Sequence, residues 1–589
     1  MQDLSIKLAP ARDHMHAGRF DKAAALLQRL AQQHPKRPDV LSLLIISLIR
    51  SGKAPQAQYY VDQARAMSAG DPRALLDLGN LLAQQAQGEM AIPLFEAALA
   101  IDPTLSAASV GLSGSHFHAY RLGDTIATAR AGLEHDPSHA LLQCNLGVAL
   151  LQAGRPREAL DVLSNAAAAN PDHELIVSAH AACTNYAGNA TPKQSYDAHR
   201  MYGALLNRQL PTPPRPKPRD PNPDRPLRVG VVSADLRAHP CGTFIEPWLA
   251  KHSKDFDITC YSVAFREDAA SKRLRGHPVK WKWEPTMNAK DFADMLARDQ
   301  IDVVLELSGL TAGHRMLALH LRPAPVQVTY FGYPNTTGLS AIDARIVDSI
   351  TDPDQPSYND VASERLVRMD PCFLCFPPIA GAPEPGPLPA RASGHVTFGS
   401  FNNVAKIDDD TIRMWTRAVL AVPASRLLLK YHALSQAPVR DAIIERFVKA
   451  GLPADRIVLD PPGKNTLETL AAYQRVDIAL DTYPYHGTTT TCEALFMGCP
   501  VVTRMGDRCV ARVSGSILAA AGVDDCTADS EDGFVEAAKR LAGDLDGLAA
   551  RRAGLREKIL ASTLCDQSAY VERLERVLRG LWKDACAAA

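Results

Sequence analysis

Residues 475–500 read RVDIALDTYPYHGTTTTCEALFMGCP, and the pattern of side chains changes type twice along this stretch. RVDIAL, residues 475–480, is a short apolar run with branched side chains, which predicts a buried strand. TCEALFMG, residues 491–498, has the spacing of a buried helix, and Gly498 with Pro500 predicts its end. A strand, a loop and a helix in this order are the unit from which parallel α/β sheets are built.

The threonine block, Thr488 to Thr491, lies at the junction between this strand and this helix. Threonine is a poor helix former, so helix propensity does not explain the block. At the carboxyl end of a parallel strand, a helix N-terminus presents free amides and the positive end of its dipole to an anion. We therefore interpret the block as a phosphate site; the alternative is helix capping, which needs only one residue.

The length and composition of the chain limit its class. Its 589 residues exceed a single core and predict three or more domains. A net charge of −1 argues against electrostatic binding to nucleic acid or to an anionic membrane. The first residues lack the apolar core of a secretory signal, and the longest apolar run, residues 40–49, falls far short of the roughly 20 residues that cross a bilayer. We expect a soluble, cytoplasmic protein.

The 12 cysteines are dispersed along the chain. The only CxxC pair, Cys372 and Cys375, has no second pair that would complete a tetrahedral metal site. We expect reduced and mostly buried thiols.

An internal repeat occupies the first third of the chain. Gly79, Ala91 and Pro103 have the same spacing as Gly147, Ala159 and Pro171, which fits a helix–turn–helix unit of about 34 residues. Small residues at fixed positions let the two helices of a unit approach closely, and proline ends the second helix. The segment resembles tetratricopeptide repeats in about five units, with degenerate copies near residues 45–70 and 105–135. Such arrays form a superhelix whose concave face binds peptides or proteins.

Two proline-rich segments divide the rest of the chain. QLPTPPRPKPRDPNPDRP, residues 209–226, predicts an extended linker. Apolar runs at 227–236 and 301–307 then predict parallel strands, and after a second proline-rich segment, residues 377–393, further runs predict a second α/β half. We expect functional loops at the carboxyl ends of the strands in both halves. The predicted domains are repeats (1–195), linker (196–226), first lobe (227–385), second lobe (386–563) and C-terminal helix (564–589).

Four segments carry a resemblance to a known family. They are SADLRAHPCGTFIEP (233–247), RPAPVQVTYFGYPNTTGL (322–339), TFGSFNNVAKI (397–407) and LDTYPYHGTTTTCEALFMG (480–498). They closely resemble the catalytic region shared by protein O-GlcNAc transferases and SPINDLY proteins, and the resemblance covers residues 1 to about 580. It implies a tetratricopeptide superhelix followed by a GT-B glycosyltransferase with two Rossmann-like lobes. It also implies inverting transfer of a sugar to Ser or Thr hydroxyls of proteins. Because the residues of these segments are more similar to SPINDLY proteins, the resemblance leaves the sugar donor open between UDP-GlcNAc and GDP-fucose.

The resemblance assigns donor-side residues in the second lobe. Lys406 matches the lysine that contacts the diphosphate, and Thr488, Thr489 and Thr490 match the phosphate-binding loop. A leaving diphosphate gains negative charge, so amides, hydroxyls and a cation suit the chemistry. Glu493 matches the acid that binds the ribose, although an acid in a first helical turn is also a routine dipole partner. Asn403 is expected to reach the nucleotide. Lys464 lies near the segment that would contact the base, but the base-contacting residues of animal O-GlcNAc transferases have no clear counterparts, and Thr488 stands where those enzymes have histidine.

The resemblance also assigns residues in the first lobe. His239 matches the histidine proposed as base or substrate-positioning group; we predict its place in the site and leave its role as base open. It precedes a helix expected to start near Thr243. Asn335, Thr336 and Thr337 follow a predicted strand and are expected to line the sugar side of the cleft. His314 is a weaker candidate that could be a surface residue.

A run of aspartates, Asp408 to Asp410, contains the DxD pattern that binds a divalent metal in another glycosyltransferase fold. Here the run precedes the predicted helix TIRMWTRAVL, where acids cap an N-terminus. Since Lys406 and a helix terminus are available for the diphosphate, we predict no metal and no cofactor.

Three classes of function compete. The favoured one is a protein O-glycosyltransferase that binds protein or peptide acceptors through its repeats, with a homo-oligomer left open. The alternatives are a repeat scaffold with a non-catalytic, nucleotide-sensing α/β region, and a GT-B enzyme that acts on a lipid or small molecule. The presence of Lys406 and the threonines disfavours the scaffold, and the repeats, which suit extended polypeptides, disfavour the third class.

Overall fold

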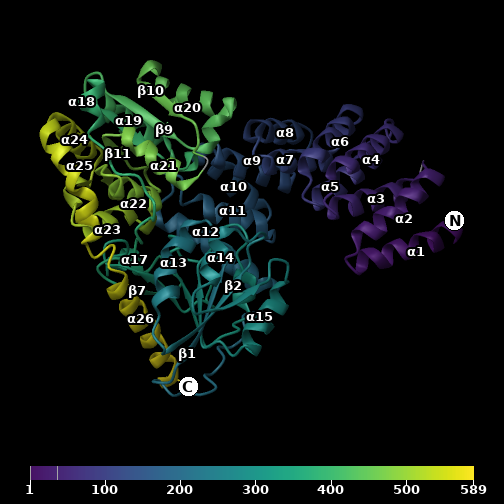
Figure 1. The fold of residues 1–589 in the computed structure, drawn as a ribbon, viewed down its shortest axis with the longest axis horizontal. Coiled ribbons are helices and arrows are strands. Elements are labelled where there is room, and N and C mark those ends of the chain that lie inside the picture. Colours follow the sequence, from purple (N-terminus) through teal and green to yellow (C-terminus); the bar gives the residue numbers. More distant parts are fainter. Residues whose placement is uncertain (1, 36, 464, 589) are drawn as a thin grey trace. The chain divides into compact units, whose positions relative to one another are not determined.

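The computed structural model describes residues 2–35, 37–463 and 465–588, and it contains helical hairpins followed by two parallel sheets (Figure 1). Two compact units form, Met1–Ala153 and Gly154–Ala589. None of the helices among the described residues is both long and apolar enough to cross a membrane.

The first unit is an array of helices in which each packs against the next along the chain, except that α4 packs on α6 and α5 packs on α3 where the chain passes from α4 to α5. Its helices are α1 (Gln2–His16), α2 (Phe20–Gln33), α3 (Pro38–Arg50), α4 (Ala54–Met67), α5 (Pro72–Gln84), α6 (Gly88–Ile101), α7 (Ser106–His118), α8 (Leu122–His135) and α9 (Ala140–Gln152). Gly79 on α5 shows why the repeat needs a small residue, since a Cβ there would lie 2.6 Å from the Phe95 ring on α6. The copies that are degenerate in sequence still fold as complete helix pairs.

The second unit begins with the last helices of the array, α10 (Pro156–Ala169), α11 (Glu174–Cys183) and α12 (Pro192–Gln209). Residues 211–226 then form neither helix nor strand, as the prolines predict. On α12, Gly203 approaches the first lobe so closely that a Cβ would lie 2.0 Å from the Gly338 carbonyl oxygen. The end of the helical array is therefore packed directly on the first lobe.

The first lobe is a seven-stranded parallel sheet of order β3-β2-β1-β4-β5-β6-β7. Its strands are β1 (Leu227–Ser233), β2 (Phe256–Ser262), β3 (Lys280–Trp283), β4 (Val303–Glu306), β5 (Val326–Thr329), β6 (Ala344–Val347) and β7 (Arg365–Arg368). Its helices are α13 (Pro240–Lys251), α14 (Ala269–Arg275), α15 (Ala289–Arg298), α16 (Met316–His320) and α17 (Pro356–Asn359). The helix expected near Thr243 begins at Pro240, because His239 is its N-cap residue.

The second lobe is a six-stranded parallel sheet of order β10-β9-β8-β11-β12-β13. Its strands are β8 (Thr397–Ser400), β9 (Arg426–Lys430), β10 (Ile457–Asp460), β11 (Ile478–Leu480), β12 (Val501–Arg504) and β13 (Thr527–Ala528). Its helices are α18 (Pro389–Ser393), α19 (Asp409–Leu420), α20 (Ala437–Lys449), α21 (Thr466–Ala472), α22 (Thr489–Phe496), α23 (Val513–Ala520), α24 (Glu531–Gly543) and α25 (Leu545–Leu560). Gly498 has φ +75°, which ends the α22 segment as predicted.

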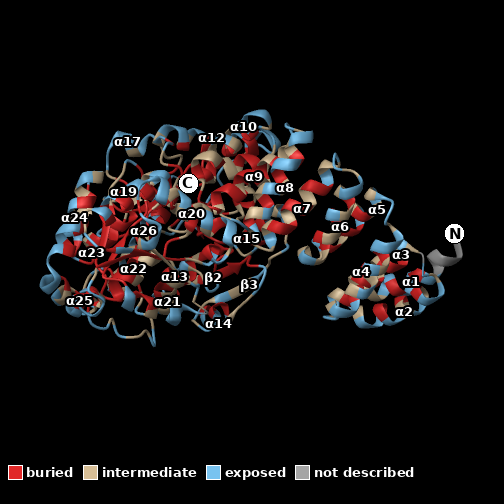
Figure 2. Cartoon of the chain, turned by 90° about the horizontal axis from the view of Figure 1, so that it is seen from above, coloured by how far each residue is buried: buried red, intermediate tan, exposed pale blue. Residues whose placement is uncertain are grey.

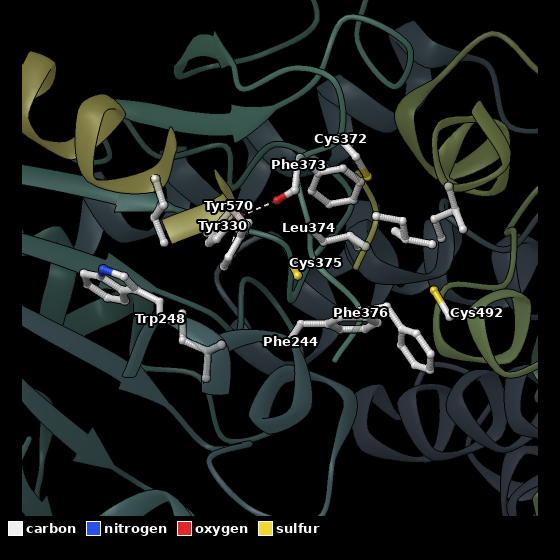
Figure 3. Close-up of a cluster of buried hydrophobic side chains, with 14 of the residues drawn as sticks. Phe244, Trp248, Tyr330, Cys372, Phe373, Leu374, Cys375, Phe376, Cys492 and Tyr570 are labelled. Atoms are coloured by element: carbon white, nitrogen blue, oxygen red, sulfur yellow. Dashed lines mark hydrogen bonds between the residues drawn. The ribbon is translucent and has the colours of Figure 1, made fainter. Parts of the chain in front are cut away.

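The final helix, α26 (Gln567–Ala587), follows the second lobe in sequence but packs on α13 and β5 of the first lobe. Figure 3 shows Tyr570 of α26 beside Tyr330 of the first lobe, whose hydroxyl donates to the Phe373 carbonyl. This contact belongs to one buried cluster that contains apolar residues of both lobes. Buried residues accordingly fill the interior of the sheet region, while exposed residues lie on the outer faces of the helices (Figure 2).

The cysteines are buried as predicted, apart from Cys586, which is half-buried, and none of those in the described residues forms a disulfide. Burial raises the pKa of the Cys372 and Cys375 thiols to about 12, so both stay protonated at neutral pH. The CxxC pair is part of the core.

The aspartate run anchors α10 and the loop after α11 to the second lobe. The Asp408 carboxylate is fully buried and accepts hydrogen bonds from the Arg157 side chain of α10 and from the Gly188 amide at 3.0 Å. Asp410 also pairs with Arg157, at 2.9 Å. The expectation that these acids cap α19 is wrong for Asp408, which occupies the N-cap position without a side-chain capping bond.

We predict that Arg157→Leu destabilises the second unit by about 3 kcal/mol, because it leaves a buried carboxylate without its cation. Arg391→Leu is the matched control, since it removes an ion pair with Asp546 whose partners are 54% and 92% exposed and should cost less than about 1 kcal/mol. Urea unfolding followed by tryptophan fluorescence checks both variants. Equal loss of stability in the two variants would contradict the anchoring role.

Candidate functional site

The strand orders place the candidate residues at one position in each sheet. The winding direction reverses between β1 and β4 in the first lobe and between β8 and β11 in the second. At such a reversal the two following loops diverge and leave a crevice at the carboxyl ends of the strands, which is where parallel α/β sheets bind ligands. His239 follows β1, Lys406 follows β8, and the threonine block follows β11.

Lys406 follows β8, at the second of these reversals. It ends a short 3-10 helix, Val404–Lys406, whose N-cap Asn403 accepts from the Ala405 amide at 3.0 Å. Its Nζ donates to the His486 carbonyl oxygen at 2.8 Å and lies 4.1 Å from the centre of the Tyr485 ring. Burial lowers the pKa of Lys406 to about 8, opposed by the Asp481 carboxylate. Lys406 is therefore a mostly protonated cation at pH 7.

The threonine block begins α22, two residues earlier than the helix predicted from the sequence. Thr490 donates to Asn402 Oδ1 at 2.9 Å, and Thr491 shares a hydrogen bond with Ser514 at 2.8 Å. The Thr489 hydroxyl, in contrast, is buried without a hydrogen-bond partner, and no side chain caps the helix. The free amides of the first turn and the Thr489 hydroxyl are thus unsatisfied polar groups at the start of α22.

A buried aspartate shapes the loop that precedes the threonines. Asp481 Oδ1 accepts from the Gly487 amide at 2.7 Å and the Thr482 amide at 2.9 Å, and its Oδ2 accepts from the Thr503 hydroxyl at 2.7 Å. His486 is also buried, and its ring contacts the Ser514 amide and the Arg504 carbonyl. Asp481 and His486 were not predicted as site residues from the sequence, where the one available signal was an acid directly after a buried strand.

Glu493 lies one turn into α22. Burial raises the pKa of this carboxyl to about 7, and it makes no hydrogen bond or ion pair within the described part of the chain. A buried acid without a partner is suited to receive a hydroxyl donor from a ligand. Asn403 uses its side-chain oxygen to cap the 3-10 helix, so only its amide group is left for a nucleotide. Lys464 lies outside the described residues.

In the first lobe, His239 is the N-cap of α13, where its Nδ1 accepts from the Cys241 amide at 3.3 Å. Burial lowers the pKa of His239, while Asp235, 3.7 Å from Nδ1, opposes the shift. The capping bond uses the Nδ1 lone pair, so the neutral ring carries its proton on Nε2 and presents a hydrogen-bond donor.

Asp235, His239 and Cys241 bring possible metal-ligand atoms within 4.8 Å of one another. Two of these groups are engaged elsewhere, because Asp235 accepts from Arg237 at 3.0 Å and the Cys241 thiol donates to the Leu307 carbonyl. The cluster therefore fits a metal ion poorly.

Three residues expected on the sugar side are engaged by the protein itself. Thr336 and Thr337 are fully buried and donate their hydroxyls to Glu364, and Asn335 donates to Asn185 at 2.7 Å and Ser195 at 2.9 Å. The structure thus gives the two threonines a structural role in place of the expected one, because the buried Glu364 carboxylate requires donors. His314 is half-buried, and burial lowers its pKa to about 4, so its ring is uncharged at neutral pH.

The chain contains two lobes, each built on a parallel sheet with polar groups where the winding direction reverses, and α26 returns to the first lobe. These features define a GT-B glycosyltransferase fold. Residues 212–376 and 388–574 match the model of glycosyl transferase family 41, and residues 14–58, 42–106 and 119–174 match tetratricopeptide repeat models. The chain belongs to glycosyl transferase family 41.

Curated relatives and a solved structure agree with this membership. A Solanum lycopersicum protein named probable UDP-N-acetylglucosamine–peptide N-acetylglucosaminyltransferase SPINDLY is 38% identical over 410 residues, which are 68% of this chain and 43% of the relative. The Arabidopsis thaliana protein of the same name is 37% identical over 411 residues, 68% of this chain and 44% of the relative. The chain thus matches less than half the length of these relatives. A solved Thermobaculum terrenum O-GlcNAc transferase variant superimposes with a TM-score of 0.81 at 31% identity, covering 88% of this chain and 98% of that one.

We predict opposite effects of Glu493→Gln on stability and on ligand binding. Because the folded-state pKa is raised to about 7, ionisation of Glu493 costs stability as the pH rises above its unfolded value of roughly 4.5. The amide should therefore stabilise the unliganded protein by roughly 3 kcal/mol at pH 8, with the gain vanishing near pH 4. The same change should weaken nucleotide binding, because it removes the carboxylate acceptor.

Melting temperature across this pH range and isothermal titration with UDP and GDP check the two effects. Glu536→Gln is the control, since the Glu536 side chain is 70% exposed on α24. A Glu493→Gln protein that is more stable and binds nucleotides normally would remove Glu493 from the binding site.

Proposed function

We propose that this protein transfers a sugar from a nucleotide sugar to Ser or Thr hydroxyls of protein or peptide acceptors, with inversion at the sugar. The observation that carries the proposal is the set of polar groups after β8 and β11: the Lys406 ammonium, the free amides of α22 and the unpartnered Thr489 hydroxyl. Family membership and the names of the relatives support the same activity.

These groups suit the departure of a nucleoside diphosphate. As the bond between the sugar C1 and the phosphate oxygen breaks, its electron pair stays on that oxygen, while the acceptor hydroxyl attacks C1 from the opposite face. Fixed donors and a cation stabilise the growing charge without reorganising, which is where such groups accelerate a reaction most. Lys406 and α22 therefore hold the diphosphate, and Glu493 receives a hydroxyl of the nucleotide.

His239 contributes from the opposite lobe. With Nδ1 used in the cap of α13, its Nε2–H is a donor, which suits binding an oxygen of the donor or acceptor better than removing a proton. We infer that His239 positions a substrate, and the group that takes the acceptor's proton stays open. The repeats supply the surface for extended polypeptide acceptors, as expected for this repeat class.

Thermal-shift titration with UDP-GlcNAc, UDP, GDP-fucose and GDP tests the proposal and identifies the donor. A ligand at 100 times its dissociation constant adds roughly 2.7 kcal/mol to the free energy of unfolding, which is readily measured. Stabilisation by one nucleotide pair and transfer of its sugar to a protein acceptor are expected. Failure of all four ligands to stabilise the protein would contradict the proposed function.

We predict that Lys406→Ala and Thr489→Val each lower turnover more than donor affinity, by on the order of 100-fold, since their interactions strengthen as the phosphate gains charge. Thr489→Val should leave the melting temperature nearly unchanged, because the hydroxyl it removes has no partner in the protein. Thr490→Val is the matched control and should lower stability, because it breaks the bond to Asn402. Normal turnover in both Lys406→Ala and Thr489→Val would contradict the proposed role of these residues in binding the donor diphosphate.

We also predict that transfer persists in excess EDTA. Lys406 and α22 already provide positive charge for the diphosphate, and the aspartates of the DxD pattern are occupied by Arg157. Loss of turnover in EDTA that manganese or zinc restores would show that transfer needs a metal.

A further inference from the structure

The loop between α11 and α12, residues 184–190, contacts both lobes, and we call it the bridging loop. On the side of the first lobe, Asn185 donates to the Tyr333 hydroxyl at 2.9 Å and accepts from Asn335 at 2.7 Å. The Tyr333 hydroxyl also bonds to His199 of α12 at 2.7 Å. The loop is thus hydrogen-bonded to the segment that follows β5.

The second lobe holds the same loop from the other side. Arg508 is buried and donates to the carbonyl oxygens of Thr184 at 2.9 Å and Ala187 at 3.0 Å. The Gly188 amide donates to Asp408, and a Cβ on Gly188 would lie 2.5 Å from carboxylate oxygens of Asp408 and Asp410. The backbone of the bridging loop is therefore fixed by charged side chains of the second lobe.

Tyr186, at the centre of the bridging loop, reaches the lysine site. Its ring centre lies 4.7 Å from that of Tyr485, and the Lys406 Nζ lies 4.1 Å from the centre of the Tyr485 ring. Burial raises the pKa of Tyr485, and the nearby Tyr186, Tyr333 and Cys241 raise it further, so the hydroxyl stays neutral. The Tyr485 ring therefore contacts both the Lys406 ammonium and the Tyr186 ring of the bridging loop.

We propose that Tyr485 is a positioning residue for the Lys406 ammonium, and that the bridging loop holds Tyr485 in place through Tyr186. The end of the repeat array is thereby coupled to the group that binds the donor phosphate. This inference rests on the proposed function, because it takes Lys406 as the phosphate-binding cation.

The ring acts through its face. A lysine ammonium over an aromatic ring is attracted to the negative face, and this attraction favours the protonated lysine over the neutral amine. The other titratable groups that face Lys406 are Asp481, which favours its cation, and His486, which burial keeps neutral. The His486 carbonyl fixes one N–H of Lys406, and the ring fixes the direction of approach.

Removing the ring should therefore lower the pKa of Lys406. Tyr485→Leu keeps an apolar side chain at the site but removes the cation's partner, so the pKa of Lys406 should fall below its present value of about 8. Diphosphate binding, which needs the cation, should then weaken at a lower pH than in the wild type. Tyr485→Phe keeps the ring face and should behave as the wild type.

The experiment measures the affinity of the full chain for UDP, GDP and inorganic pyrophosphate between pH 6 and 10, together with turnover. In wild type we expect affinity to fall above pH 8, and Lys406→Ala should flatten this dependence. In Tyr485→Leu the midpoint of the pH dependence of affinity should move down by about one pH unit, and turnover should be roughly tenfold lower. Tyr186→Leu should move it in the same direction by less, whereas Tyr186→Phe should not.

Tyr261→Leu is the matched control, because Lys282 also lies over the Tyr261 ring, at 5.8 Å, away from the candidate site. It should lower the melting temperature without moving the midpoint. An unchanged or higher midpoint in Tyr485→Leu overturns the inference, and Tyr186→Leu decides if Tyr485→Leu does not fold. Absence of binding by UDP, GDP and pyrophosphate to wild type instead contradicts the proposed function, whereas binding with an unmoved midpoint contradicts only the role of Tyr485.

Discussion

The reversal of winding between β8 and β11 is the constraint on which the rest of the site depends. Since neighbouring strands at this point send their chains to opposite faces of the sheet, the loop that carries Lys406 and the loop that carries the threonines separate there. Two hydrogen bonds join the two loops again, from Thr490 to Asn402 at 2.9 Å and from Lys406 to the His486 carbonyl oxygen at 2.8 Å, and they limit how far the loops part. The first lobe repeats the same arrangement between β1 and β4, so His239 occupies the equivalent position.

Polar groups in this protein are largely satisfied by other parts of the chain, which makes the exceptions informative. The fully buried Arg552 donates to carbonyl oxygens that include Val476 at 2.8 Å and Pro385 at 2.8 Å, and Arg508 does the same for the bridging loop. Thr489 and Glu493 are exceptions at the candidate site, because the Thr489 hydroxyl is buried without a partner and the half-buried Glu493 carboxyl has no hydrogen bond or ion pair among the described residues. An unsatisfied buried group costs stability, and a binding site is where a ligand can recover that cost.

Local sequence patterns predicted the fold well. They did not predict the roles of polar residues whose contacts lie far away in the sequence. The apolar run at 475–480 contains β11, and the constant spacing of Gly79, Ala91 and Pro103 predicted close helix pairs. Thr336 and Thr337 were expected to line the sugar site, but they donate hydrogen bonds to Glu364. Asp408 was expected to cap a helix, but it pairs with Arg157, 251 residues away. The side chain that a polar residue contacts depends on tertiary packing, which periodicity does not encode. The threonine block could be placed from the strand–loop–helix order, which periodicity does encode, whereas Lys406 was assigned through the family resemblance.

The return of α26 to the first lobe has a consequence for how the protein is made. Tyr570 and Trp582 are buried, and both belong to the cluster that the first lobe shares with the second. During synthesis from the N-terminus, β1 to β7 leave the ribosome well before α26, so the apolar surface around Trp248 and Tyr330 stays uncovered while the second lobe is translated. The first lobe therefore completes its core after the second lobe has emerged, and exposed apolar surface of this kind is what chaperones bind.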